Sequence, residues 1–235
     1  MYNGAERQRL SAYRSYSIYL QEDFSKWESL VEGVCPELHR RGEVIRAAGD
    51  TSARATVLRT GVAQVGTVLH SGRGIGVYLG GPGCVYGLAS NLMGPAAEPT
   101  LTCLTALSDC EVYHVPRHLC RQWIARSPEH HQAVASHEMR KAVLFMQHIE
   151  LLALSKIRSR VLALLLALAG SLGEDRPDGV EIPLTLTHQQ LADIVLSDRV
   201  TVARILSDLT KLDLLAKRGG HYILYDVPEL CRQVI

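Results

Sequence analysis

The sequence predicts an α+β chain with three parts: a small N-terminal β-roll of the jelly-roll type, one long helix, and a C-terminal winged helix-turn-helix. Three observations carry this prediction. Twelve of the 19 glycines lie between positions 42 and 94, no glycine or proline occurs between Pro128 and Gly170, and two helix patterns followed by a hairpin pattern fill residues 184–227. A chain of 235 residues, 47% of them hydrophobic, can bury two cores of this kind.

The N-terminal part is expected to consist of short strands, preceded by a helical segment. Its glycines are interleaved with β-type runs at 55–69 and 74–81, and a further strand pair is expected at 101–115. Glycine at this density, with valine, threonine and tyrosine between, is typical of short strands joined by tight turns. We therefore expect a small β-barrel or β-roll over residues 1–127.

A long helix is expected over residues 129–154, within a dimerisation segment at 128–154, and would be about 39 Å long. Six residues repeat at spacings of 4, 3, 4, 3 and 4, as in a heptad seam: Ala135, Met139, Ala142, Met146, Ile149 and Ala153. A second apolar line widens the buried arc: Val134, Leu144, Phe145, Leu151 and Leu152. One face can then pack on the β-roll while the seam meets a twin helix in a homodimer. The alternative is one long helix buried within a monomer.

The C-terminal domain is expected at 155–235 and begins with a helix at 156–171. Residues 173–179 are expected to form a loop, and residues 180–184 a short strand whose Pro183 suits the edge of a sheet.

A helix-turn-helix is expected next. Thr187 and Gln190 form a capping box, so a helix should begin at His188, and Leu196 and Ser197 should end it. The residues expected to be buried in it are Leu191, Ala192, Ile194 and Val195. A second helix should run from about 199 to 212 with four residues facing inward: Val202, Ile205, Leu206 and Leu209.

A hairpin of strands 214–217 and 221–225, joined by a two-residue Gly219-Gly220 turn, should follow the second helix as the wing. Two short helices and a hairpin in this order predict a winged helix-turn-helix whose second helix enters the DNA major groove. Its outward face is expected to present Arg199, Val200, Ala203, Arg204 and Ser207.

Arginines on that face can pair with guanine, and Val200 and Ala203 can contact thymine methyl groups. Residues at the helix starts can bind phosphate oxygens. The candidate DNA contacts are Thr187, His188, Gln189, Ser197, Arg199, Val200, Thr201, Ala203 and Arg204. The alternatives are a surface helix that merely carries arginines, and a wing that contacts protein instead of DNA.

Charge limits the strength of this interface. The formal net charge is +1, and residues 155–235 hold ten Lys/Arg against ten Asp/Glu. We expect four acidic residues to lie away from the phosphates: Asp193, Asp198, Asp208 and Asp213. Binding should then be modest, strongly salt-dependent and reliant on both subunits.

The layout from about residue 27 onward resembles the cyclic AMP receptor protein and fumarate–nitrate reductase regulator (CRP/FNR) superfamily. The residues that carry the resemblance are Gly42, Gly49, Gly61, Gly81, Gly87, the long helix and 199–206. The resemblance implies a double-stranded β-roll like that of cyclic-nucleotide-binding domains, a dimerising helix and an inverted-repeat operator. It also implies RNA polymerase as a partner in many members. Halorespiration regulators, which sense small aromatic acids, resemble the chain most, through the Val-Thr-Val that follows Arg199.

The chain departs from the family at the effector site. Cyclic-nucleotide binders carry a glutamate where Leu88 follows Gly87, and an arginine pair where this chain has 98–100. A buried phosphate without that arginine is costly, so we expect a small effector other than cyclic AMP. By the resemblance, the candidate effector contacts are Tyr86, Gly87, Leu88, Ser90, Thr100 and Lys141. Lys141 is the only lysine of the long helix and would pair with an anionic effector. The alternative is a solvated lysine near the dimer seam.

A further departure is Leu196, which stands in the turn where the family usually has glycine. If the left-handed backbone is kept there, leucine costs about 1 kcal/mol or more.

No iron–sulfur cluster or metal site is expected, because the six cysteines are scattered and show no zinc spacing. A haem held by other histidines stays open, as does gating by thiol oxidation. The chain is not expected to be an enzyme: it has no GxSxG, HExxH or P-loop motif, and the glycines of 74–80 have the wrong spacing for a dinucleotide loop. Without a signal peptide or a long apolar run, we expect a cytoplasmic protein with no membrane partner.

Overall fold

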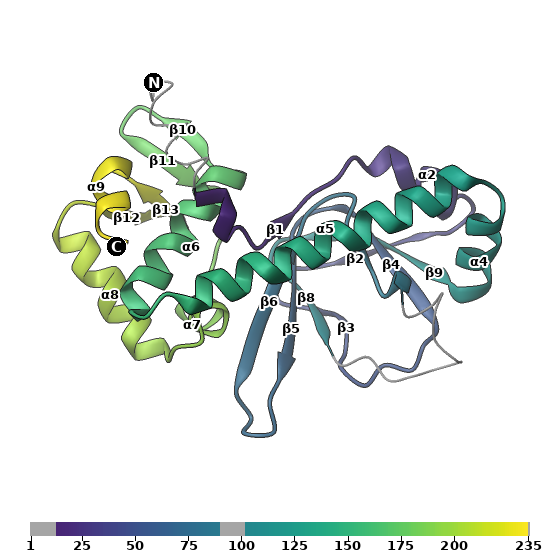
Figure 1. Ribbon diagram of the computed structural model, residues 1–235, viewed down its shortest axis with the longest axis horizontal. Coiled ribbons are helices and arrows are strands. Elements are labelled where there is room, and N and C mark those ends of the chain that lie inside the picture. Colours follow the sequence, from purple (N-terminus) through teal and green to yellow (C-terminus); the bar gives the residue numbers. More distant parts are fainter. Residues whose placement is uncertain (1–12, 90–101, 235) are drawn as a thin grey trace. The chain divides into compact units, whose positions relative to one another are not determined.

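The computed structural model describes residues 13–89 and 102–234 (Figure 1). It divides into two compact units. The roll unit holds residues 20–68 and 78–143, and the C-terminal unit holds 69–77, 144–234 and the described residues before 20. Among the helices of these residues, none is both long enough and apolar enough to cross a membrane.

The roll consists of two antiparallel sheets, as the glycine pattern predicts. Their strand orders are β1-β6-β5-β8-β3 and β2-β9-β4-β7. The strands are β1 (Tyr19–Leu20), β2 (Pro36–His39), β3 (Val44–Arg46), β4 (Arg54–Thr60), β5 (Ala63–Val68), β6 (Gly74–Gly80), β7 (Val85–Tyr86), β8 (Cys103–Ala106) and β9 (Cys110–Pro116). The strands expected within 55–69, 74–81 and 101–115 are therefore confirmed. Gly61, with φ +88°, turns the chain between β4 and β5, where the Asp109 carbonyl leaves no room for a side chain.

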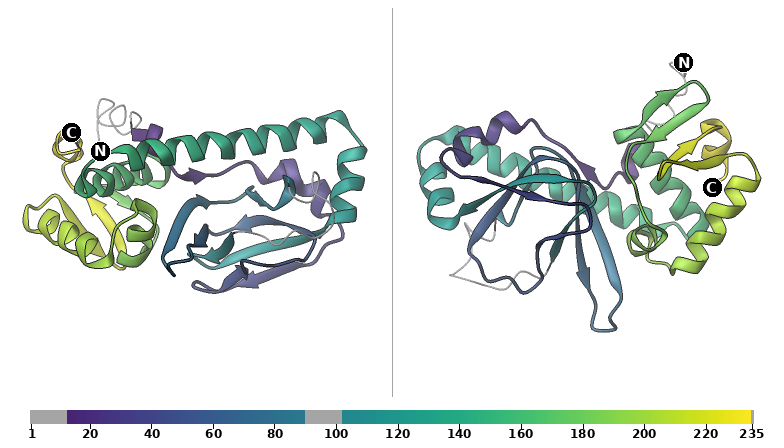
Figure 2. Two further views of the ribbon diagram at one scale, coloured as in Figure 1. Left: turned by 60° about the horizontal axis from the view of Figure 1, so that its bottom comes forward. Right: turned by 180° about the vertical axis from the view of Figure 1, so that it is seen from behind.

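Short helices pack on the outer face of one sheet of the roll unit (Figure 2). A hydrophobic core cluster is buried between these helices and the sheet. The helices are η2 (Phe24–Trp27), α2 (Glu28–Val31) and α4 (Arg117–Ala125). The Trp27 and Trp123 rings meet at 5.8 Å between centroids, and the Trp27 indole N–H donates to the Gly83 carbonyl at 2.8 Å. Val57 and Tyr113 of the sheet pack into the same cluster.

The expected long helix is confirmed as α5 (Pro128–Ala153). Every residue of the heptad seam is exposed, including Met139 at 67%, Met146 at 59% and Ile149 at 60%. The second apolar line is only partly buried, and Phe145, expected inside, is 42% exposed beside the seam.

The face of α5 that is actually buried carries polar groups at spacings of 4, 3, 4 and 3: His137, Lys141, Leu144, His148 and Leu151. The search for apolar residues did not find this face, because three of its five residues are polar. These polar side chains can be buried because they have interaction partners. The Nε2 atom of His137 lies 2.9 Å from the Val85 carbonyl, and that of His148 lies 2.8 Å from the Ile194 carbonyl.

The C-terminal unit is built around α6 (Ile157–Leu172), which is buried from Val161 to Ala169. Four helical elements pack on it: η1 (Tyr13–Tyr16), α7 (His188–Val195), α8 (Arg199–Lys211) and α9 (Val227–Arg232). A sheet of order β10-β11-β13-β12 completes the unit. Its strands are β10 (Glu174–Arg176), β11 (Gly179–Ile182), β12 (Leu215–Arg218) and β13 (His221–Leu224).

Two sequence predictions are wrong here. The expected loop at 173–179 contains strand β10, which pairs with β11 in a hairpin where Arg176 lies opposite Gly179. Strand β11 is consequently central and not at an edge, and Pro183 lies just beyond its end. Arg176 holds the hairpin through ion pairs with Glu174 at 3.0 Å and Glu181 at 2.6 Å.

Candidate nucleic-acid interface

The first helix of the helix-turn-helix begins with the expected capping box. The Thr187 Oγ1 accepts the Gln190 backbone N–H at 3.1 Å, and the Gln190 Oε1 accepts the Thr187 backbone N–H at 2.8 Å. These bonds satisfy two of the backbone donors that a helix start leaves open. All four residues expected inside α7 are buried.

Leu196 ends α7 in the left-handed conformation, with φ 53° and ψ 51°. The backbone geometry usual for glycine is therefore kept, and leucine bears its cost of about 1–2 kcal/mol. The next amide, Ser197 N–H, donates to the Ala192 carbonyl at 2.9 Å, which closes the helix end. The Ser197 carbonyl accepts a hydrogen bond from Arg73 at 3.2 Å.

The second helix, α8, begins at the expected residue and ends one residue before the expected 212. Its four expected inward residues are all buried. Asp198 caps it by accepting the Thr201 backbone N–H at 2.8 Å and the Thr201 hydroxyl at 2.7 Å. The outward face is open: Val200 is 77% exposed, Arg199, Arg204 and Ser207 are exposed, and Ala203 is half-buried.

The cap shows where one of the four acidic residues lies. Asp198 stands at the start of α8 directly before Arg199, and its placement away from the phosphates stays a prediction. A carboxylate is favoured there because it meets the positive end of the helix dipole. The Thr201 hydroxyl, a candidate phosphate donor, is already given to that carboxylate.

The candidate phosphate contacts lie around the start of α7. Thr187 and Gln189 are exposed, while His188 and Ser197 are half-buried. The Gln189 amide donates to Asp193 at 2.7 Å. Burial lowers the pKa of His188, and the positive charges of Lys217 and Arg199 lower it further. The contribution of two cations to the lowered pKa of His188 indicates a positive local potential, which suits the anionic phosphate backbone of DNA.

The wing is the expected hairpin. Strands β12 and β13 pair with Arg218 opposite His221, and the turn residues Gly219 and Gly220 have φ of 57° and 93°. Lys217 donates to the Leu186 carbonyl at 3.1 Å and lies 4.6 Å from the centre of the Tyr222 ring. Arg218 pairs with Asp178 of the β10–β11 hairpin at 2.8 Å, a contact that sequence reasoning missed together with β10.

The candidate effector contacts are only partly brought together. Tyr86 and Leu88 are buried, and Gly87 between them has φ +72°. Ser90 and Thr100 lie outside the described residues. Lys141 is 8% exposed and pairs with Glu138 at 2.7 Å, so the alternative of a solvated lysine is wrong.

Sequence reasoning missed two neighbours of these residues. The Tyr78 ring stacks on Tyr86 at 6.0 Å between centroids. Arg46 is buried beside Gly87, but its guanidinium is held by Asp50 at 3.0 Å and by the carbonyls of Arg54 and Ser52 at 3.0 and 3.1 Å. Alternation along β6 could have revealed Tyr78, whereas nothing local marks Arg46 as buried.

Comparisons with known proteins agree with this architecture. Residues 37–127 match the cyclic nucleotide-binding domain, and residues 159–233 match the Crp-like helix-turn-helix domain. The global nitrogen regulator of Synechococcus elongatus is 31% identical over 197 residues, which are 84% of this chain and 88% of that protein. A CRP-like cAMP-activated global transcriptional regulator of Mycobacterium tuberculosis is 23% identical, covering 82% and 85%. The c-di-GMP responsive global regulator CLP of Xanthomonas campestris shares the fold, with a TM-score of 0.75 and 18% identity over 87% of this chain and 100% of that one.

A capped helix-turn-helix with a wing, preceded by a β-roll and a long helix, defines a DNA-binding transcription regulator. The chain belongs to the CRP/FNR family of these regulators, as the resemblance in its sequence implies.

Proposed function

We propose that the chain binds an inverted-repeat operator as a homodimer and that a small effector in the β-roll, other than cyclic AMP, controls this binding. In this proposal residues 1–127 sense the effector, 128–154 form the dimerisation helix, 155–235 bind DNA, and RNA polymerase is a further partner. The observation that carries it is the open outward face of α8, where Arg199, Val200 and Arg204 are exposed on a helix that Asp198 caps.

The reading of bases is assigned to that face. Arg199 and Arg204 are five residues apart, about a turn and a half of helix, and both side chains are exposed. Each can donate two hydrogen bonds to the O6 and N7 atoms of a guanine, while Val200 and Ala203 meet thymine methyl groups. Thr187, His188 and Gln189 fix the register on the phosphates from the start of α7.

Two-fold symmetry is supported by α5. Its exposed Met139, Met146 and Ile149 share one line of the helix, and apolar side chains at heptad spacing are covered when a twin helix packs on them. A two-fold symmetric dimer formed through α5 presents two copies of α8 to two half-sites, which matches a palindromic operator.

The effector differs from those named for the relatives. The regulator from Mycobacterium tuberculosis is named as cAMP-activated, and the regulator from Xanthomonas campestris is named as c-di-GMP responsive. In this chain Leu88, which is fully buried, stands where cyclic-nucleotide binders carry a carboxylate for the ribose. An anionic effector would instead reach Lys141 by replacing Glu138 as its partner.

The deciding experiment selects bound duplexes from a random library and measures the affinity of the selected site by fluorescence anisotropy. Arg204→Ala and Arg199→Ala should each lose about 1–3 kcal/mol of binding, roughly 5- to 150-fold, and relax the preference at one base position. The matched control is Arg232→Ala in α9, an exposed arginine paired with Glu229, which should bind as the wild type does. A protein that retains no duplex at low salt would refute the proposal and leave a protein-binding wing.

A further inference from the structure

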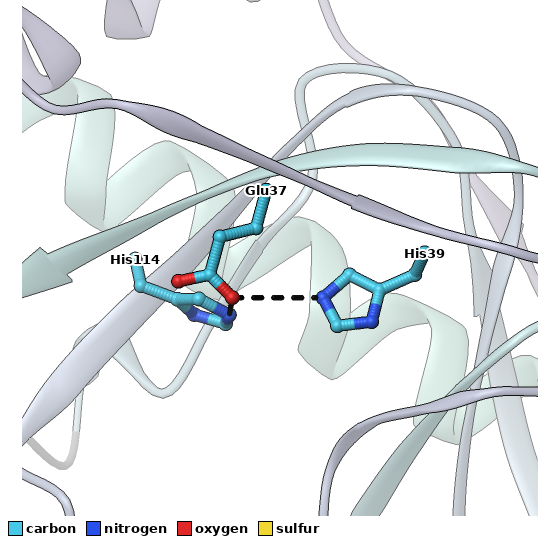
Figure 3. A group of neighbouring side chains, drawn as sticks. All are labelled: Glu37, His39 and His114. Carbon is cyan, nitrogen blue, oxygen red and sulfur yellow. Dashed lines mark ion pairs between the residues drawn. The ribbon is translucent and has the colours of Figure 1, made fainter.

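Three side chains with metal-ligating atoms meet on one face of a sheet in the roll unit (Figure 3). Glu37 and His39 are two residues apart on β2, so they point to the same side. Strand β2 pairs with β9 so that Glu37 faces Val112 and His39 faces Cys110, and His114 is two residues beyond Val112. The register therefore puts His114 on the face that Glu37 and His39 share.

The distances suit a single ion. The Glu37 Oε2 lies 3.6 Å from the His114 Nε2 and 4.0 Å from the His39 Nε2, and the three ligand atoms are within 4.8 Å of one another. Two ligands bonded at about 2.0–2.1 Å to a tetrahedral ion lie about 3.3–3.4 Å apart. Shifts of about an ångström or less, shared between the exposed Glu37 side chain and the two imidazoles, would bring these atoms to that spacing.

Both imidazoles have a second partner that orients them. The His114 Nδ1 lies 3.0 Å from the Thr56 hydroxyl, and the His39 Nδ1 lies 3.8 Å from the Glu43 carboxylate. A proton on each Nδ1 leaves each Nε2 with its lone pair toward Glu37. Metal-binding histidines are held in this way, by a polar group on the nitrogen that does not touch the metal.

Burial makes this cluster different from a chance surface group. The His114 side chain is 7% exposed and that of His39 is 16% exposed. Within the described part of the chain, the buried His39 Nε2 makes no hydrogen bond. Glu37 is 56% exposed, which leaves a path for an ion and a place for a bound water.

The charges nearby are balanced. The positive charges of Arg54 and Arg46 act on His114, but Asp50 pairs with both arginines, at 3.9 and 3.0 Å. Glu37 and Glu43 add two negative charges around the imidazoles. A divalent cation is therefore not opposed by uncompensated positive charge.

We propose that Glu37, His39 and His114 bind a divalent transition-metal ion, with Zn²⁺ as the best match and water as the fourth ligand. Two imidazoles and one carboxylate suit zinc and its neighbours, whereas Mg²⁺ and Ca²⁺ favour sites made of oxygen atoms. The ion would tie the edge strand β2 to β9. No spacing of cysteines and histidines predicts the site, because its ligands come from strands far apart in the sequence.

The test uses the full chain, stripped with a chelator and then dialysed against buffered Zn²⁺, with bound metal counted by mass spectrometry. The wild type should hold one ion per chain, and its melting temperature should rise with Zn²⁺. Glu37→Gln and His39→Gln should each weaken binding at least tenfold. The matched control His118→Gln, an exposed histidine outside the cluster, should bind as the wild type does.

Co²⁺ absorption distinguishes this site from binding to cysteines. Nitrogen and oxygen ligands give visible bands without the intense near-ultraviolet band of a thiolate, and His114→Gln should abolish those visible bands. The proposal is overturned if the wild type holds no ion, if the Glu37 and His39 variants hold it as tightly, or if the thiolate band appears. Circular dichroism of each variant verifies that it is folded, and Glu37→Gln, an exposed change, keeps the test valid if His114→Gln unfolds.

Discussion

Asp198 accepts two hydrogen bonds from Thr201, one from its backbone N–H at 2.8 Å and one from its hydroxyl at 2.7 Å. This cap joins the turn of the helix-turn-helix to the helix that carries the candidate base contacts. Asp198→Ala should lower the free energy of unfolding by about 1 kcal/mol, because it leaves the Thr201 amide without its acceptor. Asp198→Asn keeps an acceptor and should lose only a few tenths. Urea denaturation measures both, and equal losses would show that the cap is not the cause.

Leu196 holds a left-handed backbone at φ 53°, so its replacement tests how much strain the turn stores. Glycine removes a conformational cost of about 1–2 kcal/mol from the folded state. It also makes the unfolded chain more flexible, which lowers stability by about 0.5–1 kcal/mol. Leu196→Gly should therefore raise the free energy of unfolding by up to about 1.5 kcal/mol. Leu196→Val, whose branched side chain suits this region worst, should lower it by about 1 kcal/mol or more. A loss on glycine substitution would mean that packing of the leucine side chain outweighs the strain.

Sequence reasoning succeeded where the signal lies within a few residues. Thr187 and Gln190 are three apart, and the seam from Met139 to Ile149 repeats along one helix, so helix starts and exposed faces could be predicted from local spacing. Strand β10 has no apolar alternation, since Glu174, Asp175 and Arg176 are all exposed, and it forms because β11 pairs with it.

Contacts between distant segments could not be predicted in this way. The register that sets His114 beside Glu37 depends on how β2 pairs with β9, which no local pattern encodes. The buried face of α5 was missed for a related reason. His137 and His148 look polar in the sequence, but backbone carbonyls far along the chain supply their hydrogen-bond partners.

His148 should make stability depend on pH. Burial lowers its pKa below the ordinary 6.5, against the opposing effect of its hydrogen bond to the Ile194 carbonyl. Below pH 6.5 the unfolded chain then binds more protons than the folded one, so the free energy of unfolding falls as the pH falls. Replacement by glutamine, which can still donate to that carbonyl, should flatten this slope in denaturation at pH 7.5 and 5.5. His118→Gln, exposed, should leave the slope as in the wild type.

The cysteines should differ sharply in reactivity. Burial raises the pKa of Cys84 to about 12 and that of Cys120 to about 11, so neither is a thiolate near pH 8, whereas Cys35 is exposed. Brief alkylation of the native protein at pH 8, followed by peptide mass spectrometry, should modify Cys35 first and leave Cys84 and Cys120 intact. Labelling in urea should reach all three. Early modification of Cys84 would instead favour gating by thiol oxidation in the roll.

The exposed seam of α5 should control both association and DNA binding. Met146→Lys places a charge on the symmetry line, where a twin helix would have to desolvate two copies of it, so the variant should sediment as a monomer. Ser136→Lys is the matched control, at an exposed position that flanks the seam, where coiled-coil helices commonly carry charged residues, and it should remain a dimer. Sedimentation velocity at micromolar concentration separates the two outcomes.

Loss of the dimer should also weaken operator binding, because each half-site then binds alone without the gain from a linked second contact. Met146→Lys should bind a full inverted repeat no more tightly than a half-site, whereas Ser136→Lys should keep the preference for the repeat. A Met146→Lys protein that stays dimeric would move the interface elsewhere on the chain. A monomer that still prefers the full repeat would show that the two DNA-binding domains cooperate through the DNA and not through α5.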